Sequence, residues 1–205
     1  MKSFNTKIIA ISNQKGGVGK TTSAVNIASF LAITETPTLL IDVDPQANAS
    51  IGVGIESAKN CSIYDVLINQ KNINKCIHNT KIEYLDIIPS SPQLAGAEIE
   101  LVSMFTRESI LKESLNQLKG KYKYIIIDSP PSLGLLTVNI FTAANSLIIP
   151  IQCEYYALEG LSQLLNTIRM VQKHLNTALE IEGILITMYD HRLNLSRQVV
   201  QELNE

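Results

Sequence analysis

One stretch near the N-terminus restricts the fold of this chain more than any other: residues 14–22, with the sequence Gln-Lys-Gly-Gly-Val-Gly-Lys-Thr-Thr. It follows the apolar run at residues 8–11 and leads into an amphipathic segment that ends near Leu31. Its three glycines let the backbone turn sharply and point successive N–H groups at an anion. A helix that begins at Lys20 adds unpaired N–H groups and the positive end of its dipole. The stretch therefore predicts a strand, a phosphate-binding loop and a helix, in that order.

The loop departs from the usual phosphate-loop pattern G-x-x-x-x-G-K-[ST], because Gln14 replaces its first glycine and Lys15 is an additional lysine. In such a loop Lys20 reaches the β- and γ-phosphates and the Thr21 hydroxyl ligates Mg²⁺. A dinucleotide-binding turn is the nearest alternative, since Asp42 lies about 20 residues further on, but that fingerprint fails at its third glycine. We therefore predict a nucleoside triphosphate site. Its binding residues are Lys15, Gly16, Gly17, Val18, Gly19, Lys20, Thr21 and Thr22.

Composition excludes several other classes of protein. The 205 residues are 45% hydrophobic and 18% charged, which is enough for a sizeable core and unlike disordered or fibrous chains. The formal net charge of −2 gives no global attraction to nucleic acid, so DNA binding would need a local basic patch. No apolar run approaches the ~20 residues of a membrane span, and residues 1–7 lack the apolar centre of a signal peptide. We expect a cytoplasmic protein with no membrane partner.

The three cysteines, Cys61, Cys76 and Cys153, are too far apart for a C-x-x-C metal or redox motif. An odd number of cysteines suits a reducing compartment. The spacing predicts three free thiols, with Cys153 buried.

Apolar runs and amphipathic stretches alternate along the chain, which predicts an α/β fold with a mostly parallel, doubly wound sheet and helices on both faces. Strands are expected at residues 7–12, 38–42, 84–88, 124–128, 146–150 and 181–187. Helices are expected at residues 20–34, 62–68, 135–144 and 158–175, with one or two more across 94–118. Leu195, Val199, Val200 and Leu203 mark the apolar face of a further helix near the end of the sequence. Residues 44–48 read as a loop, because Pro45 disfavours helix in the residue before it. No linker or repeat divides residues 1–205, so we expect a single domain.

Acidic residues follow two of the expected strands, where ligands bind in parallel α/β sheets. Asp128 ends an apolar strand, which is the position of an acid that holds Mg²⁺ directly or through water. Asp42 and Asp44 share one face of an extended chain. One of the two can support the metal while the other orients the attacking water, although Asp44 could also be an ordinary turn residue. The predicted metal ligands are Thr21, Asp42 and Asp128.

Lys15 lies five positions before Lys20 on the same loop and cannot easily fold back to the same phosphates. It can instead project from the loop toward a phosphate held by a second subunit, as an arginine finger does. That role would couple ATP binding to dimerisation. The alternative is an exposed, solvated lysine.

Taken together, these motifs resemble those of the ParA/Soj chromosome- and plasmid-partition ATPases. Residues 15–22 are similar to the deviant Walker A motif with its signature lysine, residues 42–46 to the Walker A′ motif, and residues 126–131 to Walker B. Residues 93–98 and 152–160 add to the resemblance, which covers essentially the whole chain. It implies a P-loop ATPase of the deviant Walker type.

The resemblance implies ATP and Mg²⁺ as ligands, and slow hydrolysis in which Lys15, Lys20 and Asp44 act as the catalytic residues. It implies an ATP-bound sandwich homodimer that binds DNA without sequence preference and associates with the nucleoid. Hydrolysis stimulated by a centromere-binding, ParB-like partner would release it. The family's DNA-binding arginines lie late in the chain, where this sequence has Arg192 and, as a weaker candidate, Arg197.

Members of the family usually continue with a further strand and a closing helix, so we expect the domain at 1–205 to lack these elements. Three alternatives share parts of the pattern. A MinD-like, membrane-associated positioning ATPase has the same nucleotide motifs, and a nucleotide-gated dimer scaffold would bind ATP and barely hydrolyse it. A reductase like the nitrogenase iron protein needs cluster cysteines at positions that this chain does not match.

Overall fold

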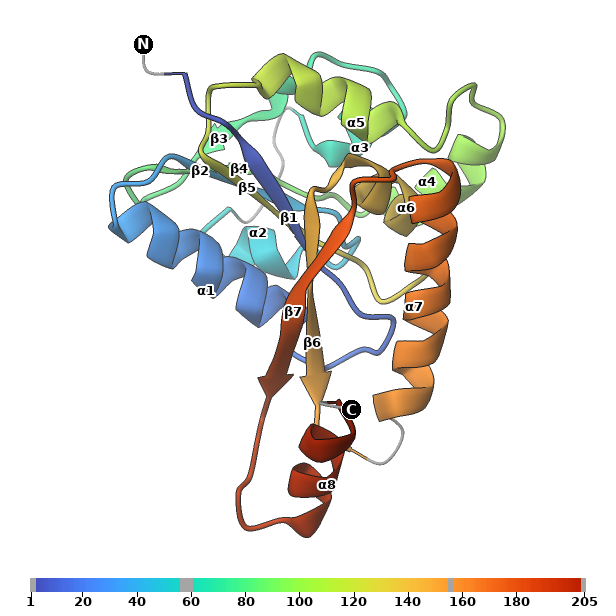
Figure 1. Ribbon diagram of the computed structural model, residues 1–205. Coiled ribbons are helices and arrows are strands. Elements are labelled where there is room, and N and C mark those ends of the chain that lie inside the picture. The colour runs from blue at the N-terminus through green and yellow to red at the C-terminus, as the bar shows by residue number, and fades with distance from the viewer. Residues whose placement is uncertain (1–2, 56–60, 155–156, 204–205) are drawn as a thin grey trace.

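The computed structural model describes residues 3–55, 61–154 and 157–203, and these residues form a seven-stranded sheet with the order β3-β4-β2-β5-β1-β6-β7. Neighbouring strands are parallel except for β3, which is antiparallel to β4 (Figure 1). The strands are β1 (Lys7–Ile11), β2 (Thr38–Asp42), β3 (His78–Asn79), β4 (Leu85–Ile88), β5 (Tyr124–Asp128), β6 (Ser146–Gln152) and β7 (Glu180–Thr187). This order places the end of β1 in the middle of the sheet.

Helices cover both faces of the sheet, which confirms the doubly wound α/β prediction. One face carries α1 (Lys20–Ile33) and α2 (Asn48–Gly52). The other carries α3 (Ile63–Leu67), α4 (Leu94–Val102), α5 (Ile110–Leu115), α6 (Leu135–Ala143) and α7 (Ala157–His174). Short 3₁₀ turns lie at η1 (Ile73–Cys76) and η2 (Asn116–Leu118), and α8 (Asn194–Leu203) follows β7 beyond the carboxyl ends of the strands (Figure 1).

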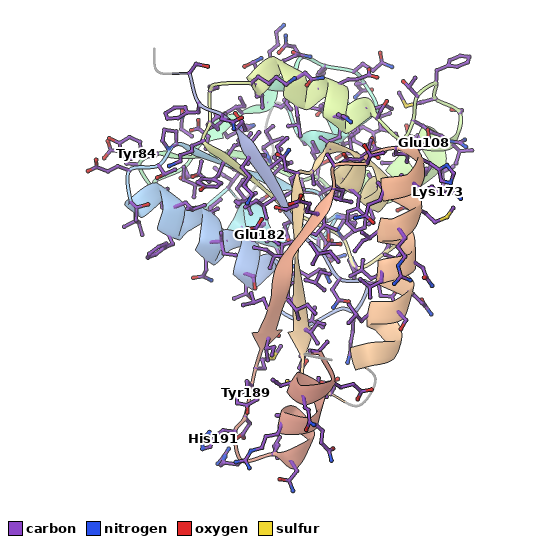
Figure 2. All side chains as sticks on the ribbon, in the orientation of Figure 1. Tyr84, Glu108, Lys173, Glu182, Tyr189 and His191 are labelled. Atoms are coloured by element: carbon purple, nitrogen blue, oxygen red, sulfur yellow. A yellow bond between two sulfur atoms is a disulfide. The ribbon has the colours of Figure 1, made fainter. Side chains whose placement is uncertain are left out.

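The last strand, β7, lies at one edge of the sheet and is more exposed than the strands in the centre. Glu182 on this strand forms an ion pair with Lys7 of β1 at 2.6 Å and accepts a hydrogen bond from Ser146 of β6 at 2.7 Å (Figure 2). These contacts tie the edge of the sheet to its centre.

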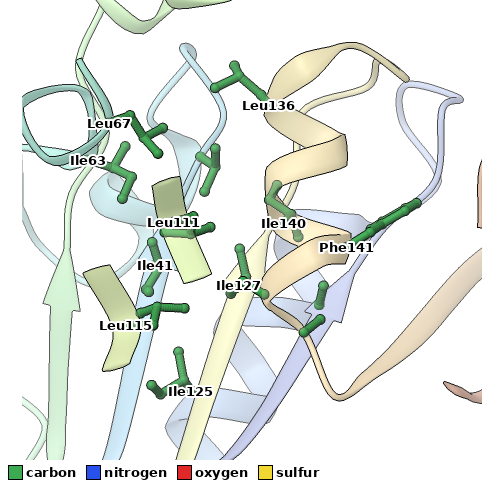
Figure 3. Close-up of a cluster of buried hydrophobic side chains, with 14 of the residues drawn as sticks. Ile41, Ile63, Leu67, Leu111, Leu115, Ile125, Ile127, Leu136, Ile140 and Phe141 are labelled. Atoms are coloured by element: carbon green, nitrogen blue, oxygen red, sulfur yellow. The ribbon is translucent and has the colours of Figure 1, made fainter. Parts of the chain in front are cut away.

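The larger hydrophobic core lies between the sheet and α3–α7. Ile41, Ile125 and Ile127 of the central strands contact a layer of side chains from several helices (Figure 3). That layer includes Ile63, Leu67, Leu111, Leu115, Ile140 and Phe141. Complete burial of one such side chain contributes roughly 1.5–3 kcal/mol. On the opposite face α1 uses a stripe of alanines, Ala24, Ala28 and Ala32, which allows the helix to approach the sheet closely.

Most elements lie where the sequence predicts them, within the one or two residues by which boundaries vary. A capping box begins α3, since the side chains of Ser62 and Asp65 satisfy each other's backbone N–H groups. The stretch 94–118 contains α4, α5 and η2. Three short elements were not predicted: α2, η1 and β3.

The prediction of three free thiols is wrong for two of them. Cys61 and Cys76 form a disulfide, with Cα atoms 4.7 Å apart, whereas Cys153 is free and buried as predicted. Cys61 directly precedes the N-cap of α3, and Cys76 ends η1. The spacing rules for metal and redox motifs miss this pair, because α3 and η1 fold the chain back on itself between the two cysteines.

Candidate nucleotide site

The glycine-rich loop leaves β1 between its neighbours β5 and β6 and enters α1. Gly17 and Gly19 have φ angles of +75° and +87°, in the left-handed region that side chains disfavour. Gly19 is the N-cap of α1 and has no side chain to cap the helix, so the first N–H groups of α1 remain available to a ligand. Val18 is buried beneath the loop. The loop therefore has the geometry of an anion site at a helix N-terminus.

A cavity of about 650 Å³ opens over this loop. Six of the eight predicted binding residues line it: Gly16, Gly17, Gly19, Lys20, Thr21 and Thr22. Asp44 lines the same cavity from the end of β2. Lys20 is 6% exposed, and its Nζ donates a hydrogen bond of 2.8 Å to the carbonyl oxygen of Lys15. Burial lowers the pKa of Lys20, while Asp128 and Asp44 act to raise it.

Asp128 is the least satisfied polar group of the site. Its side chain is completely buried, and neither oxygen has a hydrogen-bond partner of normal geometry within the described residues. Burial, and then the charges of Asp42 and Asp44, raise its pKa to about 7, against the opposing effects of Thr21 and Lys20. A buried carboxylate without a partner is costly unless a cation or a donor satisfies it. Mg²⁺ prefers oxygen ligands, so Asp128 beside the Thr21 hydroxyl fits this ion.

Asp42 is held differently, although it also lies at a strand end and is buried. Its carboxylate accepts hydrogen bonds from the Ser50 backbone N–H at 2.8 Å, the Ser50 hydroxyl at 2.7 Å and the Asp44 backbone N–H at 3.1 Å. Burial raises the pKa of Asp42, and the Ser50 bonds oppose that effect. Asp42 therefore holds α2 and the Asp44 turn against the sheet. These bonds give Asp42 a supporting role in the ligand-free protein, and its role as a metal ligand stays a prediction.

Within the described residues, no three acidic, histidine or cysteine side chains lie close enough to hold a metal ion by themselves. A cation here would depend on Asp128, Thr21 and the oxygens of a bound phosphate. This is the usual Mg²⁺ arrangement, in which few carboxylates act together with substrate phosphates.

Asp44 lies at the mouth of the cavity and is 8% exposed. Its Oδ1 accepts a hydrogen bond of 2.9 Å from the backbone N–H of Gln46, and its carbonyl oxygen accepts one of 2.9 Å from Ala47. Ala47 has a φ of +54°, which closes the turn before α2 begins. The turn therefore fixes the Asp44 carboxylate at the cavity rather than leaving it to move with solvent.

The Lys15 side chain points away from the cavity that Lys20 lines. Its ammonium forms an ion pair with Glu154, just beyond β6, and Lys15 borders a second hollow of about 510 Å³ together with Leu133 and Gln163. The structure thus places the two lysines of one loop at different sites. This arrangement agrees with the inference that Lys15 does not share the phosphates of its own subunit.

Sequence reasoning missed the contribution of β7 to the site. Thr187 and Met188 line the main cavity, and the Thr187 hydroxyl donates a hydrogen bond of 2.9 Å to the carbonyl oxygen of Val18. The Thr187 methyl group would lie 3.4 Å from a Cβ at Gly19, so the strand end packs closely on the loop. Asn48 and Pro131 also line the cavity. No local signal marks these residues, because the strand order alone brings them to the loop.

The two predicted DNA-binding arginines lie outside the cavity, beyond the end of β7. Arg192 donates to both carboxylate oxygens of Asp190, at 2.7 and 3.0 Å, and remains largely exposed. Arg197 is exposed on α8. This tip of the molecule also carries Tyr189 and His191 (Figure 2). In the motif at residues 152–160, Tyr155 and Tyr156 lie outside the described residues.

Comparison with known proteins gives consistent matches over almost the whole chain. A family model described as an AAA domain matches residues 6–181. The chain is 58% identical to the sporulation initiation inhibitor protein Soj of Bacillus subtilis, over 97% of this chain and 79% of that protein.

Two solved structures show the same fold. Cobyrinic acid a,c-diamide synthase from Mycobacterium smegmatis, with a bound ATP analogue and magnesium, has a TM-score of 0.92 at 39% identity, over 97% of this chain and 82% of the other. A plasmid partition protein from Borrelia burgdorferi has a TM-score of 0.86 at 32% identity, over 98% of this chain and 86% of that protein. The similarity therefore includes the sheet, the loop and most of the cavity described above.

Proposed function

Since the chain belongs to the Soj/ParA family of chromosome-partitioning ATPases, we propose that it is an ATP-gated dimer that binds DNA and is released by its own slow, Mg²⁺-dependent hydrolysis. The observation that carries this proposal is the buried, unpartnered carboxylate of Asp128 beside Thr21 and Lys20 at a helix N-terminus. Lys20 and Thr21 line the cavity, and Asp128 interacts with both from its buried position. A cationic group and an anionic group thus lie close together, as a triphosphate and Mg²⁺ require.

The chain's own residues divide the work of hydrolysis between them. Lys20 and the first N–H groups of α1 bind the β- and γ-phosphates. Asp44, fixed by its turn, orients the water that attacks the γ-phosphate. Thr21 and Asp128 hold the metal, with Asp42 supporting the Asp44 turn. A bound Mg²⁺ would neutralise charge on the phosphate oxygens. Positioning and charge compensation are sufficient for this reaction, because phosphoryl transfer needs little covalent help from a protein.

Dimerisation follows from the position of Lys15. Its side chain points away from the nucleotide cavity of its own subunit. We therefore propose that it reaches the phosphates of an ATP that a second copy of the chain holds. In a symmetric pair each subunit would supply its lysine to the other's ATP. ATP then binds both chains together, whereas ADP, without a γ-phosphate, does not.

Lys15→Ala is expected to leave ATP binding largely intact and to abolish ATP-dependent dimerisation, because Lys20 and the loop N–H groups bind phosphate within one subunit. Light scattering with a slowly hydrolysed ATP analogue and Mg²⁺ measures the dimer. Lys7→Ala is the matched control, since it also removes a half-exposed, ion-paired lysine. A dimer of wild-type strength in Lys15→Ala would reject the role in trans.

DNA binding is proposed for the tip that follows β7, where Arg192 and Arg197 lie. The net charge of the chain is −2, so attraction to phosphate must be local. Arg192 is four positions beyond Met188, which lines the nucleotide cavity. A ligand against Met188 can therefore influence the loop that carries Arg192, linking the nucleotide to the DNA surface.

Arg192→Glu is expected to weaken DNA binding about 3–10-fold near 0.15 M salt, equally for unrelated sequences, because phosphate contacts carry no sequence information. The slope of log affinity against log salt should fall by about 1. Fluorescence anisotropy of the ATP-bound dimer on two unrelated duplexes measures both. Arg169→Glu makes the same charge change at an exposed position of α7 and should have little effect. If Arg192→Glu binds DNA as tightly as the wild type at matched salt, Arg192 does not belong to the DNA-binding surface.

We further propose that a centromere-binding, ParB-like partner stimulates hydrolysis and thereby releases the dimer from DNA. The nearest alternative is a membrane-positioning ATPase. No helix in the described part of the chain is long and apolar enough to span a bilayer. Co-sedimentation of the ATP-bound protein with DNA and, separately, with anionic vesicles distinguishes the two: ATP-dependent retention by DNA supports partition, and retention by vesicles alone contradicts it.

A further inference from the structure

The Lys15–Glu154 ion pair joins two groups that are anchored to the same strand. Glu154 follows β6, and its backbone N–H donates to the carbonyl oxygen of Gln152 at 2.8 Å. The Lys15 backbone N–H donates to Asn13 at 3.0 Å, and the Asn13 amide donates to the carbonyl oxygen of Pro150 at 2.8 Å. The sheet thus fixes the distance between the loop and the acid, so the pair is a property of the fold.

From this geometry we propose that Glu154 is a positioning residue, which holds Lys15 on its own subunit until the ATP of a second subunit displaces it. The inference rests on the proposed role of Lys15 in trans. In the ion pair, the Lys15 ammonium binds the Glu154 carboxylate of its own chain. The same ammonium must leave that carboxylate to bind the phosphates of an ATP held by the second subunit. Glu154 therefore competes directly with dimerisation.

The surroundings of Lys15 allow the exchange. The side chains of Lys15 and Glu154 are 36% and 45% exposed, so the pair can open without disturbing the core. Lys15 borders the hollow of about 510 Å³ formed with Gln14, Leu133 and Gln163. Gly160 of α7 also lines this hollow. The helix approaches the loop closely there, since a Cβ at Gly160 would lie only 3.3 Å from the side-chain amide nitrogen of Gln14. The lysine thus has open space beside it into which it can swing.

The expected size of the effect follows from the exposure of the pair. A half-exposed ion pair changes an equilibrium by about fivefold at most. A symmetric dimer opens two such pairs, one in each subunit, so loss of Glu154 can tighten the dimer by up to ~25-fold. A change of this size would set the ATP and protein concentrations at which the dimer forms.

Glu154→Gln tests the proposal directly, in the full chain with an ATP analogue and Mg²⁺. Sedimentation is expected to give a dimer dissociation constant about 5–25-fold lower than that of the wild type. The control is Glu182→Gln, which breaks the ion pair with Lys7. The two side chains of that pair are 42% and 41% exposed, against 36% and 45% for Lys15 and Glu154. The Glu182→Gln dimer should be unchanged.

Reductive methylation followed by mass spectrometry gives a readout that a general loss of structure would not imitate. In the nucleotide-free monomer, Lys15 should react faster in Glu154→Gln while Lys7 does not, and Glu182→Gln should show the reverse. If the Glu154→Gln dimer is no tighter than the wild-type dimer while Lys15→Ala stays monomeric, the proposed role of Glu154 is overturned and that of Lys15 is not. A Lys15→Ala variant that still dimerises would instead overturn the proposed role of Lys15 in trans.

Discussion

Asp44→Ala is expected to lower the single-turnover rate of ATP hydrolysis about 10²–10³-fold while ATP stays bound, because the attacking water loses the group that orients it. The turn at Asp44 holds the carboxylate at the cavity through Gln46, and Lys20 and the loop still bind the phosphates. The variant should therefore accumulate as an ATP-bound dimer on DNA. Rapid quenching of a reaction with labelled ATP measures the rate without product release.

Asp44→Asn is the matched variant, since its side-chain oxygen can still accept the Gln46 hydrogen bond and keep the turn. If the carboxylate matters through its charge, Asp44→Asn should be nearly as slow as Asp44→Ala. A rate within a fewfold of the wild type in both variants would reject Asp44 as the water-orienting residue and leave it as a turn residue.

Asp128→Asn is expected to stabilise the ligand-free protein above neutral pH while it weakens Mg²⁺-dependent ATP binding. Burial raises the pKa of Asp128 to about 7 from an ordinary value of 3.8, so the folded state binds more protons than the unfolded state between these values. The free energy of unfolding therefore falls as pH rises from about 4 to 7, and the full penalty applies above that range. Asparagine carries no charge and avoids the penalty.

The free energy of unfolding of Asp128→Asn should exceed that of the wild type by about 1–3 kcal/mol at pH 8 and by close to zero at pH 4. The gain is smaller than the pKa shift of Asp128 alone would give, because the asparagine amide is also buried without partners. Urea unfolding without nucleotide at the two pH values measures it. Calorimetry should show in parallel that Mg²⁺ no longer strengthens ATP binding. If the free energy of unfolding depends on pH identically in the wild type and Asp128→Asn, the buried Asp128 carboxylate does not destabilise the ligand-free protein.

A residue that destabilises the empty protein and is retained at a ligand site is the usual sign of a function-stability conflict. Asp128 has this character, because it is the one ionisable side chain among the buried groups of the described residues that lack a hydrogen-bond partner; the other two are the hydroxyls of Ser12 and Ser90. Binding of a cation and a triphosphate would relieve the strain. The free energy that folding loses at Asp128 is thereby available to ligand binding.

The sequence predicted the strands, the phosphate loop and the strand-end acids because each has a local signature. Buried parallel strands are continuous apolar runs, as the fully buried Thr38–Asp42 shows. The loop needs glycines where φ is positive, at Gly17 and Gly19. Such features depend on neighbours in the chain, so a single sequence reveals them.

The features that the sequence missed all depend on long-range contacts. Helix α2 has Ala47 rather than a polar residue at its N-cap, and Asp42 holds it through Ser50. Thr187 reaches the loop because β7 pairs with β6. Glu154 meets Lys15 across 139 positions of sequence. Neither spacing nor periodicity predicts these contacts, since strand order creates them.

The central claim is that Lys15 acts on the ATP of the other subunit, and mixing two inactive variants tests it most directly. Lys15→Ala retains Asp44, and Asp44→Ala retains Lys15, so a mixed dimer has one complete site only if the lysine crosses between chains. A mixed dimer keeps one of the two Lys15 contacts, so it should form less readily than the wild-type dimer. Random pairing would put half the chains in mixed dimers with one working site each, so an equimolar mixture should recover hydrolysis up to a ceiling of about a quarter of the wild-type rate. A mixture in which sedimentation shows mixed dimers, but which is no more active than the two variants measured separately, would contradict the account.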